Sequence, residues 1–218
     1  MILAIVPAFN ESKTIRAVVQ GLLPMVNQVV VIDDGSHDTT ATEAEAAGAK
    51  VLRHEVNRGQ GAALETGHAY ARQNGAQIVV HFDADGQLDP ADIARGINLM
   101  HEKNADIILG SRFLEKKSNL PWFKKNIILP IGRFVDRFFG GVRLTDAHNG
   151  FRILNSRALA VVQLEQNRMA HATEIPQLIR RHKLVYAELP ITVSYREFGQ
   201  GVSGGLKIIR DLIMNKIV

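Results

Sequence analysis

The chain of 218 residues contains no cysteine, which excludes a disulfide framework and thiol chemistry. It also lacks any run of about 18 uninterrupted apolar residues, so no transmembrane helix is predicted. No basic segment precedes the first apolar run, and a secretory signal peptide is therefore not expected. That run is followed by no glycine-rich turn, which argues against a dinucleotide-dependent oxidoreductase.

Charge is distributed unevenly along the chain, although the overall net charge is only +4. Residues 1–109 carry 8 Lys and Arg against 14 Asp and Glu, whereas residues 110–218 carry 18 against 8. The length suits one domain, 1–218, and 46% hydrophobic residues allow a substantial core. Charge alone does not decide what the basic half, residues 110–218, contacts. Nucleic acid, anionic lipid, a phosphorylated substrate and plain solvent all stay open.

Short apolar runs alternate with helical patterns through the first half of the chain. Strands that are apolar throughout and alternate with helices indicate a parallel sheet covered on both faces, which is the α/β class. Asn10 is expected to cap the first helix. We predict strands at 2–6, 29–32, 51–52, 78–82, 106–110 and 184–193, and helices at 11–23, 39–47, 59–74, 90–102 and 173–182.

Polar residues follow four of these predicted strands at the point where each strand ends. In open parallel sheets, ligands bind beyond the carboxyl ends of the strands. Four polar clusters on one edge are hard to explain as independent turns, so we expect a binding site there. The clusters are Asn10-Glu11, Asp33-Asp34, Asn57-Arg58 and Asp83-Asp85.

The two carboxylates after the fourth strand define the chemistry expected at this edge. Side chains alternate along a strand, so Asp83 and Asp85 would point the same way if the extended geometry persists. Two converging carboxylates repel each other unless a cation neutralises them, and Mg²⁺ or Mn²⁺ suits oxygen ligands. The alternative is a plain polar turn, since Asp-Gly is a common turn pair.

Five ordered stretches of the first half resemble those of family-2 glycosyltransferases with the GT-A fold. Each stretch is weak evidence by itself, but their order and spacing together are specific. The second half, at 145–152 and 195–199, is similar to the polyprenyl-phosphate sugar synthases of the dolichol-phosphate mannose synthase type. The five stretches are 6–11, 31–40, 57–63, 82–87 and 110–113.

This resemblance implies a site for a nucleotide-sugar donor, a UDP- or GDP-sugar. Asp34 would accept a hydrogen bond from the base or the ribose; alternatively it is a turn carboxylate that caps the helix from Thr39. Glycine beside the donor would allow its close backbone approach. The residues implied at the nucleotide are Pro7, Phe9, Glu11, Asp34, Arg58 and Gly59.

The resemblance also implies a metal site, with Asp83, Asp85 and Gln87 holding Mg²⁺ or Mn²⁺ and, through it, the donor diphosphate. The metal would stabilise charge that develops on the leaving nucleoside diphosphate. Arg196 would reach the diphosphate from the C-terminal loop. The chain departs from the family pattern at Val202, where a lysine is usual, and Lys207 is a candidate substitute.

The resemblance implies that Arg112 and Arg133 bind the acceptor phosphate, and a guanidinium matches a phosphate with two parallel hydrogen bonds. The alternative for each arginine is a solvated surface charge. A lipid phosphate is already an anionic nucleophile and needs no general base. Asp146 is therefore expected to be a positioning residue, with a base role as the alternative. A second departure is His148-Asn149, which stands where a Ser is more usual before Gly-Phe-Arg. His148 would contact the acceptor or sugar, or serve as a structural hydrogen-bonding group.

Two basic, amphipathic segments, 119–141 and 203–218, occur in the second half of the chain. An aromatic-rich segment of this kind suits a membrane interface, although packing on the protein's own core is an equal alternative. We expect a nucleotide-sugar-binding half at 1–110 and an acceptor-binding half at 111–218. The enzyme would be cytoplasmic and peripheral on the inner face of the membrane, bound directly or through a small membrane-protein partner.

The predicted function is metal-dependent, inverting transfer of a sugar from a nucleotide-sugar to a polyprenyl phosphate of the undecaprenyl or dolichyl type. No nucleic-acid partner is expected, and a homo-oligomer is left open. One alternative is a glycosyltransferase that acts on a saccharide hydroxyl in cell-surface polysaccharide synthesis. A second is a non-catalytic subunit that binds nucleotide-sugars.

Overall fold

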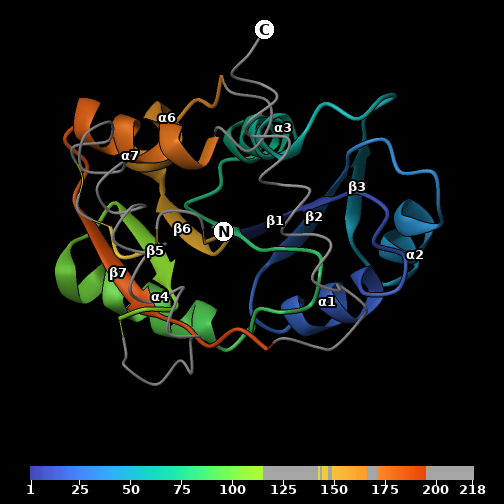
Figure 1. The fold of residues 1–218 in the computed structure, drawn as a ribbon, viewed down its shortest axis with the longest axis horizontal. Helices are drawn as coiled ribbons and strands as arrows, with labels where there is room; N and C mark the ends of the chain where they lie inside the picture. Colours follow the sequence, from blue (N-terminus) through green and yellow to red (C-terminus); the bar gives the residue numbers. More distant parts are fainter. Residues whose placement is uncertain (115–141, 143, 147–148, 166–170, 195–218) are drawn as a thin grey trace, which may run out of the picture.

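Seven strands form one sheet, in the order β3–β2–β1–β4–β6–β5–β7, within the residues that the computed structural model describes. Those residues are 1–114, 142, 144–146, 149–165 and 171–194. Figure 1 shows the sheet lying between two layers of helices. The strands are β1 (Ile2–Ala8), β2 (Gln28–Asp33), β3 (Lys50–Arg53), β4 (Ile78–His81), β5 (Ile107–Ser111), β6 (Arg152–Asn155) and β7 (Tyr186–Pro190). The helices are α1 (Ile15–Leu22), α2 (Thr40–Ala46), α3 (Gln60–Gln73), α4 (Asp92–Lys103), α6 (Ser156–Val161) and α7 (His171–Arg181).

Most neighbouring strands in this sheet are parallel. β1 pairs in parallel with β2 and β4, β2 with β3, and β5 with β7. The strand β6 lies between β4 and β5 and is antiparallel to both. The predicted α/β class with a mostly parallel sheet is thus confirmed. The strands read as continuous apolar runs because helices cover both faces of the sheet.

Side chains of β1 alternate between two hydrophobic clusters, one on each face of the sheet. Leu3 and Ile5 belong to the cluster that packs against α3, α6 and α7, whereas Ala4 and Val6 belong to the cluster that packs against α1, α2 and α4. Helix α3 lies very close to β1, since a Cβ atom at Gly67 would stand only 2.4 Å from Ile5 Cγ2. This close packing brings the start of α3 to the carboxyl edge of the sheet.

The strand β6 was not predicted from the sequence. It contains only two apolar residues, Ile153 and Leu154, between Arg152 and Asn155, so no apolar run marks it. Its backbone is instead paired on both sides, with β4 and β5. Tertiary pairing therefore decides this strand, and it places Arg152 beside His81 at the carboxyl end of β4.

The first helix begins later than predicted, at Ile15, and Asn10 does not cap it. Asn10 has a φ of 58° and bonds outside the helix: its Oδ1 accepts from His37 N at 2.9 Å, and its N donates to Ser36 Oγ at 2.9 Å. These bonds tie the loop after β1 to the loop after β2. The loop thereby places Phe9 and Glu11 beside the residues that follow β2.

Among the helices of the described residues, none is long and apolar enough to cross a membrane.

Candidate active site

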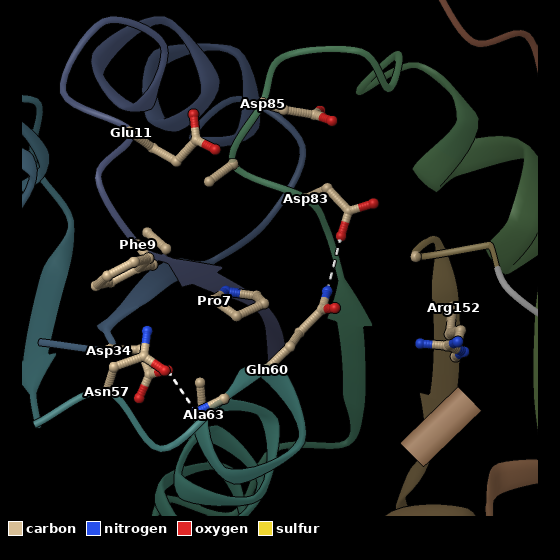
Figure 2. Close-up of a pocket in the computed structure, with 14 residues that line it drawn as sticks. Pro7, Phe9, Glu11, Asp34, Asn57, Gln60, Ala63, Asp83, Asp85 and Arg152 are labelled. Atoms are coloured by element: carbon tan, nitrogen blue, oxygen red, sulfur yellow. Dashed lines mark hydrogen bonds between the residues drawn. The ribbon is translucent and has the colours of Figure 1, made fainter. Parts of the chain in front are cut away.

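A cavity of about 460 Å³ opens at the carboxyl ends of β1, β2 and β4 and at the start of α3. Figure 2 shows Phe9, Asp34 and Asn57 on one side of it and Arg152 on the other, with Asp83 and Asp85 between. The polar clusters predicted at one sheet edge therefore surround one cavity. Its lining residues are Pro7, Ala8, Phe9, Glu11, Asp34, Asn57, Gly59, Gln60, Ala63, Asp83, Ala84, Asp85, Gly150 and Arg152.

The structure brings most of the predicted donor-site residues to this lining. Those that line the cavity are Pro7, Phe9, Glu11, Asp34, Gly59, Asp83 and Asp85. Predicted residues that are described but do not line it are Arg58, Gln87, Arg112 and Asp146. Predictions that fall outside the described residues concern Arg133, His148, Arg196, Val202, Lys207 and the segments 119–141 and 203–218.

Asp34 is a buried carboxylate held by three donors. Its Oδ1 accepts from His54 Nδ1 at 2.7 Å and from Arg58 N at 2.9 Å, and its Oδ2 accepts from Gly59 N at 2.7 Å. The alternative that Asp34 caps the helix from Thr39 is wrong, because its partners lie in the loop that leads into α3. Arg58 contributes its backbone amide to this network.

The loop after β1 supplies an aromatic ring and a carboxylate to the same cavity. Phe9 is 42% exposed, and its ring meets the imidazole of His37 edge-on, with centroids 6.3 Å apart. Glu11 accepts a hydrogen bond from Thr14 Oγ1 at 2.9 Å. Burial, and then the negative charge of Asp85, raise the pKa of Glu11 above its ordinary value. An exposed ring beside buried acceptors suits the face and the edge of a planar base.

Asp83 and Asp85 lie on a turn rather than on an extended continuation of β4. The strand ends at His81, and residues 84 and 85 form the turn, so the predicted extended geometry does not persist. The negative charges of the two carboxylates nevertheless interact. Burial, and then the charge of Asp85, raise the pKa of Asp83 to about 6. The repulsion that the sequence predicted is therefore present in this turn.

Two neighbours, Gln60 and Gly150, determine where the Asp83 carboxylate lies. Gln60 Nε2 donates to Asp83 Oδ1 at 3.3 Å from the first turn of α3. On the other side, a Cβ atom at Gly150 would lie 2.0 Å from Asp83 Oδ2, so only glycine leaves room there. Asp85 is held by its own turn, because its Oδ1 accepts from Gln87 N at 2.9 Å.

The donor set at this turn fits a hard divalent cation. Asp83 and Asp85 provide carboxylate oxygens that repel each other without a cation, and Mg²⁺ and Mn²⁺ are bound by one or two carboxylates plus substrate phosphates. Within the described ranges, no group of three or more His, Cys, Asp or Glu side chains gathers around a metal-sized space. Gln87, the third predicted ligand, does not line the cavity, and its backbone carbonyl accepts a hydrogen bond from Ser194 N at 3.0 Å.

Alternating charges continue from Asp83 through Arg152, which also lines the cavity, to Asp146 and Arg112. Arg152 of β6 is only 2% exposed; burial lowers its pKa to about 10, and the charges of Asp83 and Asp146 counteract that shift. Arg152 is thus still a cation at neutral pH. Beyond it, Asp146 Oδ2 and Oδ1 accept from Arg112 Nε at 2.7 Å and from Arg112 Nη2 at 2.9 Å. The order Asp83, Arg152, Asp146, Arg112 links the cavity to the predicted acceptor side.

Two buried imidazoles lie beneath the Asp83 turn. His81, the last residue of β4, meets His68 of α3, with their Nε2 atoms 2.7 Å apart and their rings stacked at 4.9 Å between centroids. One Nε2 must donate and the other accept, so the two rings cannot both be protonated in this contact. The pair fixes the end of β4 against α3 directly before the acidic turn.

Several lining residues received no role from the sequence. Gln60 and Gly150 each touch the space around Asp83, and Arg152 supplies a buried positive charge next to it. All three lie in stretches that carried the family resemblance, so a signal was present. The sequence did not reveal that residues 149–152 lie beside the end of β4. Their position depends on strand β6, which was not predicted.

A protein-family model and two relatives match most of this chain. The model of "Glycosyl transferase family 2" matches residues 3–162, which run from the second residue of β1 past the end of α6 and include every lining residue of the cavity. This chain is 33% identical to UDP-N-acetylglucosamine–dolichyl-phosphate N-acetylglucosaminyltransferase of Methanococcus voltae, over 100% of this chain and 96% of that protein. It is 27% identical to undecaprenyl-phosphate mannosyltransferase of Micrococcus luteus, over 98% of this chain and 91% of that protein.

A solved structure of similar fold is the complex of Mycobacterium tuberculosis glucosyl-3-phosphoglycerate synthase with Mn²⁺ and UDP-glucose. Its TM-score is 0.73 at 20% sequence identity, and the similarity covers 98% of this chain and 76% of that chain. This likeness supports the fold. The family match over residues 3–162 places the chain in glycosyl transferase family 2, as a glycosyltransferase, and the solved structure agrees in its GT-A fold.

Proposed function

We propose that this glycosyltransferase moves one sugar from a nucleotide-sugar to a polyprenyl phosphate, with inversion at the anomeric carbon and with a divalent metal ion. The observation that carries the donor half of this proposal is the acidic turn at Asp83 and Asp85, which opens into a cavity with an exposed aromatic ring at one end. The acceptor half rests on the names of two relatives that match over more than nine-tenths of both chains.

Only one orientation of a nucleotide-sugar along the cavity would suit its lining residues. The nucleoside would lie at Phe9, Asp34 and Asn57, where the ring and the hydrogen-bond acceptors are. The diphosphate would then reach Asp83 and Asp85, and the transferred sugar would extend toward Gly150 and Arg152. The opposite direction would put the diphosphate far from the acidic turn that is able to hold a cation.

Asp83 and Asp85 would hold Mg²⁺ or Mn²⁺, which would neutralise the donor diphosphate and the charge that develops on it as a leaving group. The protein's own contribution is to fix these carboxylates: Gln60 bonds Asp83, the Gln87 amide bonds Asp85, and Gly150 leaves the space that Asp83 occupies. Such prior positioning lowers the reorganisation that binding requires.

The acceptor phosphate would attack without a general base. Asp146 has both carboxylate oxygens bonded to Arg112, so it suits a positioning role better than proton abstraction. Arg112 is partly exposed and is aligned by this pair, which supports its proposed role as a phosphate ligand. Arg133, also for the acceptor phosphate, and Arg196, for the donor diphosphate, remain proposals from the sequence.

We further propose that the enzyme works at the cytoplasmic face of a membrane, as a peripheral protein, because a polyprenyl phosphate is a membrane lipid. The excess of Lys and Arg in residues 110–218 would favour an anionic surface. A small membrane-protein partner and a homo-oligomer belong to this proposal. Flotation with liposomes that contain anionic lipid tests the membrane part; failure to bind, even with a co-expressed partner, would contradict it.

The transfer itself is tested with labelled UDP- and GDP-sugars, offered with undecaprenyl phosphate or with free saccharides, in Mn²⁺ or in EDTA. We expect label in the lipid product only with a divalent metal, and none with Asp85→Ala. Glu45→Ala, at an exposed acidic residue of α2, is the matched control and should keep full activity. Label in a saccharide product, or undiminished lipid product in EDTA, would contradict the proposal.

A further inference from the structure

Most of the acceptor capacity of Asp34 is already used inside the protein. A carboxylate has about four acceptor positions, two on each oxygen. Oδ1 accepts from His54 Nδ1 and Arg58 N, and Oδ2 accepts from Gly59 N. One position therefore remains on Asp34, on Oδ2. Because Asp34 lines the cavity, that position is available to a ligand.

His54 occupies one of the hydrogen-bond acceptor positions of Asp34. The imidazole is only 8% exposed and is held at both nitrogens, by Asp34 Oδ1 at 2.7 Å and by Thr66 Oγ1 at 2.9 Å. An ionised carboxylate only accepts, so Nδ1 must carry the proton in this contact. The backbone of His54 is fixed too, since its N donates to Asp33 O at 2.9 Å. Bonds to Asp33 of β2 and to Thr66 of α3 thus aim one N–H of His54 at Asp34 Oδ1.

We infer that His54 is a specificity-determining residue: by occupying Asp34 Oδ1 it leaves a single acceptor for the donor's base, and this selects uracil over guanine. The inference rests on the proposed function, in which a nucleoside lies at this end of the cavity. Uracil presents one N–H, at N3, between two carbonyl groups. Guanine presents two neighbouring donors, N1–H and N2–H, which a carboxylate satisfies with one acceptor on each oxygen.

The exposed ring of Phe9 offers a face to either base, so stacking does not distinguish them. Discrimination then comes from the edge of the base. A guanine whose second donor meets an occupied oxygen is left with an unsatisfied N–H, which is unfavourable in a partly dry site. The same occupied oxygen has no consequence for uracil, because uracil needs only Oδ2.

Calorimetry with Mn²⁺ and either UDP or GDP tests this inference in the whole 218-residue chain. We expect the wild type to bind UDP at least about tenfold more tightly than GDP. His54→Asn keeps an N–H near the place of Nδ1 and should retain both the UDP affinity and the preference. His54→Gln keeps an N–H near the place of Nε2 instead, and should lose most of the preference. His101→Gln, on the exposed face of α4, is the matched control.

Thr66→Val is a milder variant for the case that His54→Gln does not fold, since it removes only the partner of Nε2; it should reduce the UDP-to-GDP ratio by a few-fold. Tighter binding of GDP by the wild type would overturn the inference. So would an unchanged ratio in both His54→Gln and Thr66→Val, or an equal loss in His54→Asn and His54→Gln. If UDP is preferred through His54 but no sugar reaches a polyprenyl phosphate, the proposed function fails and this inference stands.

Discussion

Gly150 and Asp83 are packed so closely that a methyl group on Gly150 would lie 2.0 Å from Oδ2 and 2.4 Å from Cγ of the carboxylate. The two residues flank different strands at the sheet edge, Gly150 just before β6 and Asp83 just after β4. The absence of a side chain at position 150 is therefore a condition for where Asp83 stands, and it links a glycine of the second half to the proposed metal site.

Replacing Gly150 by alanine should displace the Asp83 carboxylate and weaken metal binding more than it weakens the fold. We expect Gly150→Ala to abolish most of the thermal stabilisation that Mn²⁺ with UDP gives to the wild type, as measured by differential scanning fluorimetry. Gly21→Ala is the control, since the nearest atom to its new Cβ is a proline carbon at 3.2 Å. Equal Mn²⁺ responses in both variants would show that Asp83 does not bind the metal.

The pKa of Asp83 predicts a specific dependence of stability on pH. Burial and the charge of Asp85 raise it from 3.8 to about 6, so the native state binds this proton more tightly than the unfolded state does. The resulting stabilisation is complete below about pH 4 and is lost as pH rises through about 6. Without metal, Asp83→Asn should therefore raise the melting temperature at pH 7.5, and the gain should vanish near pH 4.

Asp38 provides a control of opposite sign for this titration. Desolvation raises its pKa, but hydrogen bonds from Thr40 and Ser12 outweigh that effect and lower the pKa to about 2. Its stabilising contribution is present above about pH 4 and disappears as pH falls through about 2. Asp38→Asn should thus lower the melting temperature at pH 7.5. A gain for Asp38→Asn, or a loss for Asp83→Asn, would contradict the assigned environments.

Arg152 should be important for stability because it is a buried cation between two carboxylates. Arg152→Met would leave Asp83 and Asp146 without that charge, and we expect a loss of about 3–5 kcal/mol in the free energy of unfolding. Urea denaturation measures this loss. Arg16→Met breaks the exposed pair with Glu43 and should cost less than about 1 kcal/mol. Similar losses in the two variants would mean that Arg152 is solvated or differently paired.

The pair of Arg112 and Asp146 predicts an effect on the acceptor. Arg112→Lys cannot form two parallel bonds to Asp146 and should raise the KM for undecaprenyl phosphate about tenfold, with the KM for the nucleotide-sugar nearly unchanged. Asp146→Asn should act in the same direction, because Arg112 then loses its ionic partner. Steady-state kinetics with each substrate varied in turn gives both constants. A rise confined to the KM for the nucleotide-sugar would contradict the acceptor role and assign Arg112 to the donor site.

The strands of the first half and the identity of the acidic turn could be predicted from the sequence. Apolar runs such as Val29 to Ile32 are buried on both faces, so their composition alone distinguishes them from surface segments. The polar residues that end these strands must lie at the carboxyl edge, because parallel strands share one direction. For the same reason, the order of residues along the chain was enough to expect Glu11, Asp34 and Asp83 around one site.

Contacts between distant segments could not be predicted in this way. β6 has no apolar run of its own and exists because β4 and β5 bond it on both sides, which is a property of the assembled sheet. The pairing of Arg112 with Asp146, and the space that Gly150 leaves for Asp83, depend on that strand. Residue types and their order along the chain determined which chemistry is possible here, whereas the sheet decided which groups meet, because side chains far apart in sequence interact only after the backbone has been paired.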